Sequence, residues 1–408
     1  MARMRICTAC KLINTARHND VLTVFGKGGR LYMTGQNIRL AILDNGIHPE
    51  ACPLAESFMI NDNLSATALK TSTVSPLSHG SICARIIQRY TDLENVEVFN
   101  IQILEDNSWR GNIQKLLKAF ELCISMDIRV VHLSIGTYTF EDFAKLENAV
   151  SKLLDSDRFL IASAGNRGTA TYPAYLPGVI GVQCHPYLKD DEYAYCHDKL
   201  TRIHFQASSK HRLICGGEIM ETPISNSYAA PLITGKLLSY LKTDANLENA
   251  AMLRLLAEHA GQYEGLKNSG PCPYPPVEIP VVILNGFSCS RLSCLTRFLL
   301  ERLYQEGYHA RAATDLTDAR PWDETALPGS AGLDAFIARM AWYFACDIIL
   351  LGITPYIPPD TYENVSLWIY GDEGSESLAI NAPSNGQVLW AAGMPDSKVY
   401  KLMIDMLT

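Results

Sequence analysis

Four polar residues, each next to an apolar strand or helix pattern, carry the side chains that an acyl-transfer site needs. They are Asp44, His79, Asn166 and Ser227. A serine oxygen can attack an acyl carbon, a histidine can take and return its proton, an aspartate can fix the histidine tautomer, and an amide can stabilise the oxyanion. These residue types therefore predict the chemistry of a serine hydrolase.

Ser227 lies in a short polar stretch, residues 225–231, which ends at a proline directly before a helical pattern from Leu232. A hydroxyl just ahead of a helix is held rigidly, and its alkoxide is favoured by the positive end of the helix dipole. The small side chains of Ala229 and Ala230 leave room for a substrate. The alternative is that Ser227 only caps the helix, since serine is a preferred N-cap residue.

The apolar patterns around these residues predict alternating strands and helices. A strand at 38–43 ends in Asp44, a helix begins near His79, and a strand at 159–163 leads into the loop of Asn166. Further strands are expected at 96–104, 130–136 and 179–182, and helices at 113–126, 143–154 and 232–259. This alternation predicts an α/β fold with a doubly wound, mostly parallel sheet. Sites in such sheets lie at the carboxyl ends of the strands.

Four short motifs, in this order, resemble the signatures of the subtilisin-like serine proteases. They are Leu43-Asp44-Asn45-Gly46, His79-Gly80-Ser81, Ser163-Ala164-Gly165-Asn166 and Ser227-Tyr228-Ala229-Ala230-Pro231. The order Asp, His, Ser is also that of the family. The resemblance covers about residues 37–242 and implies a sheet of subtilisin type. It implies a triad of Asp44, His79 and Ser227, with Asn166 as the oxyanion donor.

Two further segments agree with this resemblance and imply how a substrate binds. Residues 131–136 look like the substrate-pairing strand, so Leu133, Ser134, Ile135 and Gly136 are expected to pair with an extended peptide. Residues 172–174 and 179–182 look like the segment after the oxyanion asparagine, which would place Thr171 at the floor of the first specificity pocket. A threonine there removes the open floor that glycine gives. We therefore expect small or medium side chains before the cleaved bond.

The chain departs from the family pattern at two places near the expected site. The usual Gly-Thr before the nucleophile is Ser225-Asn226, so a side chain stands where the backbone bends, and rate and specificity can change there. The substrate-pairing strand has His132 where most members have asparagine. We expect His132 to be a buried or hydrogen-bonded structural residue and not a catalytic one.

The length of the chain and its prolines predict two domains. The chain has 408 residues, and four prolines within residues 270–276 form a stiff linker. We therefore expect an N-terminal segment at 1–36, a subtilisin-like serine protease domain at 37–269, a Pro-rich linker at 270–276 and a smaller α/β accessory domain at 277–408.

A loop in the accessory domain, residues 286–293, follows a predicted strand and opens a helix, as a phosphate-binding loop does. The Gly-Lys pair that such a loop requires is Arg291-Leu292 here. The favoured interpretation is a similar strand-loop-helix used for docking or left from a nucleotide-binding fold. Binding of a nucleotide is the alternative.

The composition argues against several partners. The formal net charge is −8 and there is no run of Lys or Arg, so neither nucleic acid nor a membrane is expected as a partner. The sequence shows no signal peptide and no spanning stretch, which predicts a cytoplasmic protein. The twelve cysteines lack framework spacing and are expected to be reduced, and Cys7 and Cys10 are the only close pair of metal spacing. We expect no metal and no cofactor.

These observations together predict a serine endopeptidase that cleaves a peptide or a precursor peptide. The combination of a cytoplasmic subtilisin-like protease and an α/β domain looks similar to proteases that mature ribosomally made peptide natural products, for example by removing a leader. Three alternatives stay open: a housekeeping intracellular peptidase, a non-catalytic peptide-binding scaffold, and an acyl transferase that cyclises a peptide. Neither the substrate nor the oligomeric state follows from the sequence.

Overall fold

The structure is a computed structural model of the chain. It describes residues 37–407 except 71–72, 105–110, 140–141, 156, 197–199, 216, 263–277, 317–331, 359–361, 363–364 and 372–386. The expected N-terminal segment with Cys7 and Cys10, and the expected linker at 270–276, lie outside the described residues. The domain boundary at the linker therefore stays a prediction.

The larger sheet of the described chain has the strand order β3-β2-β4-β1-β5-β6-β7-β9-β8. Neighbouring strands are parallel except β2–β3 and β8–β9, which are antiparallel. The bounds are β1 (Ile38–Asp44), β2 (Glu56–Ile60), β3 (Ala66–Leu69), β4 (Val96–Gln102), β5 (Val130–Leu133), β6 (Phe159–Ser163), β7 (Ile180–Cys184), β8 (Tyr193–Tyr195) and β9 (Ile203–Ala207). Strands β5 and β6 are buried throughout, as expected for apolar strands inside a parallel sheet. The prediction of a mostly parallel α/β sheet is confirmed.

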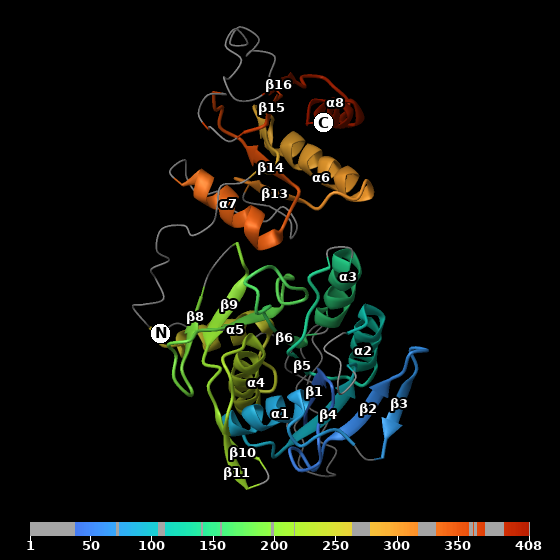
Figure 1. Ribbon diagram of the computed structural model, residues 1–408, viewed down its shortest axis with the longest axis vertical. Helices are drawn as coiled ribbons and strands as arrows, with labels where there is room; N and C mark the ends of the chain where they lie inside the picture. The colour runs from blue at the N-terminus through green and yellow to red at the C-terminus, as the bar shows by residue number, and fades with distance from the viewer. Residues whose placement is uncertain are drawn as a thin grey trace, which may run out of the picture.

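Helices cover both faces of this sheet (Figure 1). One face packs against α1 (His79–Tyr90), α4 (Asn226–Thr243) and α5 (Asn249–Glu258). The other face packs against α2 (Ile113–Ser125) and α3 (Phe143–Leu154). Helices α1 and α4 contact each other, and the hairpin β10 (Arg212–Cys215) and β11 (Glu218–Glu221) precedes α4. This doubly wound arrangement brings the starts of α1 and α4 to the carboxyl edge of the sheet.

Helix α4 begins at Asn226, so the predicted helix start at Leu232 was wrong. Ser225 is the N-cap residue, Ser227 lies in the first turn, and Pro231 lies inside the helix. A proline has no N–H for the carbonyl four residues before it. The carbonyl left without its helical partner is that of Ser227. The predicted strand at 130–136 also ends earlier, at Leu133.

A smaller sheet of five parallel strands follows, in the order β13-β14-β12-β15-β16. Its strands are β12 (Val281–Asn285), β13 (Ala310–Thr314), β14 (Ile348–Ile353), β15 (Leu367–Tyr370) and β16 (Gln387–Trp390). Helices α6 (Cys289–Gln305) and α8 (Asp396–Leu407) cover one face, and α7 (Leu333–Phe344) covers the other. A second, smaller α/β domain is therefore present, which we call the C-terminal domain.

In the loop after β12, the residues that differ from a phosphate-binding motif make structural contacts. Ser288 caps α6, and its Oγ accepts from the N–H of Arg291 at 3.4 Å. The guanidinium of Arg291 pairs with Asp396 and donates to the carbonyl of Met394 at 3.2 Å. These contacts tie α6 to α8 within the C-terminal domain.

One hydrophobic cluster continues from the α2 and α3 face of the larger sheet into the α7 face of the smaller sheet. Figure 1 shows α7 on the side of the C-terminal domain that faces the larger sheet. The two domains therefore share buried apolar surface. In the parts of the chain that the structure describes, no helix is both long and apolar enough to cross a membrane.

Candidate active site

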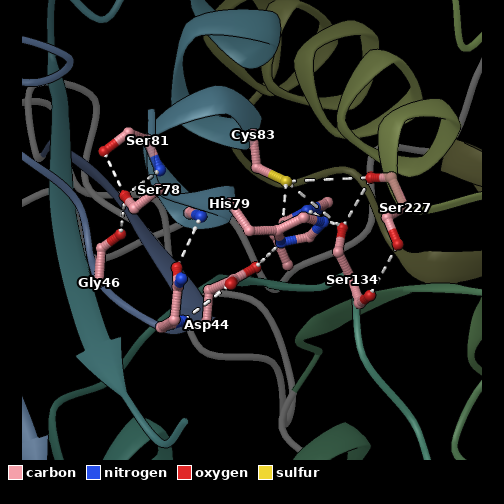
Figure 2. A network of polar contacts seen from close by, with 11 residues as sticks. Asp44, Gly46, Ser78, His79, Ser81, Cys83, Ser134 and Ser227 are labelled. Carbon is pink, nitrogen blue, oxygen red and sulfur yellow. Dashed lines mark hydrogen bonds and ion pairs between the residues drawn. The ribbon is translucent and has the colours of Figure 1, made fainter. Parts of the chain in front are cut away.

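Asp44 at the end of β1 and His79 at the start of α1 form a direct contact (Figure 2). The Oδ2 atom of Asp44 lies 2.7 Å from Nδ1 of His79, and Oδ1 accepts from the N–H of Asn45 at 2.8 Å. Both side chains are buried, at 0% and 6% exposure. A carboxylate in this position holds the proton of the ring on Nδ1, which makes Nε2 the basic nitrogen.

Short polar contacts tie the end of β1 to the start of α1. The hydroxyl of Ser78 accepts from the N–H of Ser81 at 3.2 Å as the N-cap of α1, and it also contacts the carbonyl of Gly46 at 2.9 Å. The N–H of Gly80 donates to Oδ1 of Asn45 at 3.0 Å. A Cβ atom at Gly80 would lie 2.5 Å from the carbonyl oxygen of Gly46, so this close approach requires glycine. The glycines of the two motifs thus allow the aspartate and the histidine to meet.

Ser227 joins the same cluster through its backbone carbonyl (Figure 2). This oxygen accepts from Ser134 Oγ at 2.9 Å and lies 3.9 Å from Cys83 Sγ. The carbonyl oxygen of Ser227 can accept these contacts because Pro231 has no N–H to form the usual helical hydrogen bond with it. The sulfur of Cys83 also lies 3.9 Å from Nδ1 of His79. The hydroxyl of Ser227 donates to the carbonyl of Ser134 at 3.3 Å.

His132 supports this arrangement from inside the sheet. Its Nε2 lies 2.8 Å from Ser134 Oγ, and its Nδ1 lies 2.8 Å from Thr234 Oγ1. Because Ser134 gives its proton to the carbonyl of Ser227, its oxygen accepts from Nε2–H. In the neutral ring, Nδ1 then accepts from the hydroxyl of Thr234, which also lies 3.1 Å from the carbonyl of Ala230. Burial lowers the pKa of His132 to about 3, which keeps the ring neutral as this pattern requires. The prediction of a buried, hydrogen-bonded histidine is confirmed.

Asn166 is exposed on the loop after β6 and is held by the start of α4. Its Oδ1 accepts from the N–H of Asn226 at 2.9 Å, and its Nδ2 donates to Ser225 Oγ at 3.2 Å. The side chain of Asn226 donates to the carbonyl of Gly165 at 2.9 Å and accepts from the N–H of Cys184 at 2.8 Å. The two residues that replace the usual Gly-Thr therefore anchor the asparagine loop.

The predicted substrate-pairing residues lie at and beyond the end of β5. Leu133 is fully buried and is paired on both sides, with Leu43 of β1 and Ala162 of β6. It therefore cannot pair with an added strand as predicted. The following residues, 134–136, extend past the sheet, and Gly136 is exposed. Ser134 is buried and its carbonyl accepts from the Ser227 hydroxyl, so Gly136 is the exposed residue of this segment.

Thr171 lies beside Gly136, the last residue of that segment. A Cβ atom at Gly136 would lie 2.5 Å from Cγ2 of Thr171, so the side chain of Thr171 fills the space that glycine leaves. The hydroxyl of Thr171 donates to the carbonyl of Thr169 at 3.2 Å, and only 4% of the residue is exposed. The threonine methyl group and the backbone of Gly136 are therefore packed closely together.

Two neighbours of His79 were not found by reasoning from the sequence. Cys83 lies one turn later on α1, and the i, i+4 spacing was a usable signal. Tyr228 directly follows Ser227, and its ring centroid lies 5.3 Å from that of His79. Only the packing of α1 against α4 places the tyrosine over the imidazole, so no sequence pattern indicated it.

Asp44, His79 and Cys83 offer three possible metal-ligand atoms within 4.8 Å of one another. Carboxylate, imidazole and thiolate together are a set that zinc accepts. A metal bound by Nδ1 of His79 would, however, displace the hydrogen bond to Asp44. The bond between Asp44 and His79 is therefore better suited to proton transfer than to a metal.

The charge balance at His79 favours its protonated form. Burial by itself lowers the pKa of His79, but the carboxylate of Asp44 and the neighbouring Cys83 outweigh this effect and raise the pKa above its ordinary value. A raised pKa makes the imidazole a stronger proton acceptor. It also means that the neutral, accepting form is populated only on the alkaline side of that pKa.

Comparisons with known proteins agree with this arrangement over part of the chain. Residues 35–194 match the Subtilase family, a range that includes Asp44, His79 and Asn166 and ends before Ser227. The minor extracellular protease Epr of Bacillus subtilis (strain 168) is 28% identical over 160 residues, which are 37% of this chain. The chain spans about a quarter, 24%, of the length of that curated relative.

Several solved structures of proteases are also similar to this chain. The S41 psychrophilic protease is 16% identical with a TM-score of 0.45, over 55% of this chain and 83% of the other. The prenylagaramide maturation protease PagA is 19% identical with a TM-score of 0.43, over 57% and 86%. A lanthipeptide protease is 16% identical with a TM-score of 0.41, over 55% and 81%. The sequence likeness to the Subtilase family thus covers residues 35–194 of this chain.

Proposed function

We propose that this protein is a serine endopeptidase in which Ser227 is the nucleophile, His79 the general base and Asp44 the residue that orients His79. The observation that supports this best is the buried 2.7 Å contact between Asp44 and His79. Burying a carboxylate costs free energy unless it is paired or hydrogen bonded. A buried pair of this kind beside a serine suits the transfer of a proton from that serine.

The proposed reaction has two steps. The Ser227 hydroxyl turns from the carbonyl of Ser134 and attacks the peptide carbonyl, while its proton passes to Nε2 of His79. The imidazolium then gives this proton to the leaving amine, the C–N bond breaks, and the acyl group stays on Ser227. In the second step, a water molecule gives a proton to His79 and its hydroxyl group to the acyl carbon. The imidazolium then returns this proton to the Ser227 oxygen, the C–O bond to Ser227 breaks, and the acid product leaves. Asp44 stabilises the imidazolium in both steps.

Asn166 is the proposed oxyanion donor, because the residue is exposed and its Oδ1 is already fixed by the N–H of Asn226. We expect Asn166→Ala to lower kcat by roughly 100- to 1,000-fold with little change in KM, since the donor acts on the developing charge. Steady-state kinetics on one cleaved peptide measures this. Ser225→Ala is the control, because it removes the hydroxyl bound to Asn166 but keeps the donor. A loss below about tenfold for Asn166→Ala would rule out this role.

Thr171 is the proposed floor of the pocket for the side chain before the cleaved bond. Thr171→Gly removes the methyl group beside Gly136, so we expect kcat/KM for a peptide with Phe at this position to rise at least about tenfold relative to Ala. Two fluorogenic peptides that differ only at that residue measure the ratio. Thr171→Ser keeps the hydroxyl and should give an intermediate ratio. An unchanged ratio in the glycine variant would show that Thr171 does not limit the pocket.

We further propose a precursor peptide as the substrate, with removal of a leader segment as the reaction, in the cytoplasm. The segment after β5, which ends in the exposed Gly136, suits an unfolded peptide that adds as a strand. Five buried cysteines, Cys52, Cys83, Cys123, Cys215 and Cys346, are free thiols, which fits a reducing compartment.

Two measurements test the proposed function. A fluorophosphonate probe should label Ser227 in the full chain, and a scaffold without catalysis would not be labelled. Mass spectrometry of a candidate precursor then separates hydrolysis from transfer to an amine. After hydrolysis, the two fragments together contain one added water molecule. After transfer, the acyl fragment is joined to an amine or cyclised, and no water is added. Absence of labelling would contradict the serine assignment itself.

A further inference from the structure

The C-terminal domain contacts the loop that connects Asn166 to Thr171. The carbonyl of Tyr343, at the end of α7, accepts from the N–H of Ala170 at 2.7 Å. The indole of Trp342 covers Gly168, where a Cβ atom would lie 2.8 Å from Cη2. This helix therefore rests on the loop directly between the proposed oxyanion donor and the proposed floor of the pocket.

Arg311 on β13 reaches the next residue of the same loop. It is buried, at 2% exposure, and its guanidinium donates to the hydroxyl of Tyr172. Its Cζ atom lies 4.6 Å from the ring centroid of Phe344, 5.3 Å from that of Phe143 and 5.8 Å from that of Tyr175. The cation is thus enclosed by aromatic rings from both domains, and it directs a hydrogen bond at Tyr172.

Tyr172 connects this contact to both sides of the pocket. It directly follows Thr171, and its backbone N–H and carbonyl each pair with Thr137 at 2.9 Å. Thr137 directly follows Gly136, which packs against Thr171. The position of Tyr172 therefore fixes the separation between Gly136 and the side chain of Thr171.

Holding the two domains together does not by itself require an arginine at this position. Burying a guanidinium costs desolvation free energy, and an apolar side chain of similar volume would fill the same space without that cost. What arginine adds is a directed N–H bond to the hydroxyl of Tyr172 and an attraction to the surrounding ring faces. These interactions fix the place and the orientation of one tyrosine.

We propose that the C-terminal domain is part of the specificity apparatus, with Arg311 as a positioning residue that holds Tyr172, and through it Thr171, against Gly136. The inference rests on the proposed peptidase function, because it concerns the pocket of that site. Arg311 contacts Tyr172 and the rings of Phe143, Tyr175 and Phe344. It acts on the width of the pocket and not on the proton transfer.

The test compares full-length wild type with Tyr172→Phe, Arg311→Met and the double variant. Each is assayed on two peptides that carry Ala or Phe before the cleaved bond, and for its rate of labelling by a fluorophosphonate, which does not require the pocket. We expect the ratio of kcat/KM for Ala over Phe to fall about tenfold in each single variant, mostly through KM. The labelling rate should stay within about twofold of wild type. The double variant should show no further fall, because both changes break one contact.

Tyr343→Phe is the matched control. It removes one hydroxyl from the same interface, which donates to the carbonyl of Thr201 at 3.1 Å, and it keeps the backbone contact with Ala170. Its Ala over Phe ratio should equal that of wild type. Folded Tyr172→Phe and Arg311→Met variants with an unchanged ratio, or the same fall in Tyr343→Phe, would overturn the inference. A wild type that the probe does not label would contradict the proposed function instead.

Discussion

Replacing Ser227 by alanine is expected to lower kcat on a cleaved peptide by about a million-fold. The alanine variant lacks the oxygen that forms the acyl intermediate, while Asp44, His79 and Asn166 stay in place. Residual activity then comes only from binding and from the oxyanion donor. The same variant should lose all labelling by a fluorophosphonate. Stopped and continuous assays at saturating peptide measure kcat, and intact-mass spectrometry measures the label.

Ser239→Ala is the matched control for this change. Ser239 lies on the same helix α4, and its hydroxyl donates to the carbonyl of Lys236 at 2.7 Å, away from the site. This variant should keep both its activity and its labelling. If Ser227→Ala kept the activity of wild type, another residue would have to be the nucleophile, and the proposed function of the cluster would fail.

Replacing Asp44 by asparagine is expected to lower kcat by about ten-thousand-fold, because an amide in this place favours the wrong tautomer of His79. The change should also alter the pH profile. In the wild type, the charge of Asp44 raises the pKa of His79, so kcat/KM should rise with pH through a value above 6.5. Without that charge, burial of the ring lowers its pKa. The acid limb of the variant should therefore lie at a lower pH than that of wild type.

Asp190→Asn serves as the control for the charge itself. Asp190 pairs with Arg89 at 3.2 Å on the surface, so its replacement removes the same charge outside the site. Its kcat and its acid limb should match those of wild type. An Asp44→Asn variant that keeps the wild-type acid limb would show that Asp44 does not set the pKa of the catalytic base.

The sequence alone predicted much of the larger sheet, because its strands are local apolar runs and its turns carry glycine and polar residues. Asp44 was expected at the end of a strand and His79 at the start of a helix, and both positions are confirmed. The same patterns predicted the second α/β domain. These features depend on a few neighbouring residues each, so a linear pattern is sufficient to predict them.

The start of α4 was predicted incorrectly for a physical reason. A proline usually marks a helix start, so Pro231 placed the beginning at Leu232. In the folded chain, packing against α1 and the contacts of Asn226 with the loop after β6 extend the helix back through Ser227. The cost of the missing N–H is reduced because Ser134 satisfies the carbonyl that the proline leaves open.

Linear patterns therefore determined which residues stand at the ends of strands and helices, and tertiary packing decided what those residues touch. The contact between Arg311 and Tyr172 joins residues that are 139 positions apart and lie in different sheets. The tyrosine over His79 and the two-sided pairing of Leu133 likewise depend on neighbouring elements. Such contacts form only when separate elements pack together, and no local spacing of residue types records that packing.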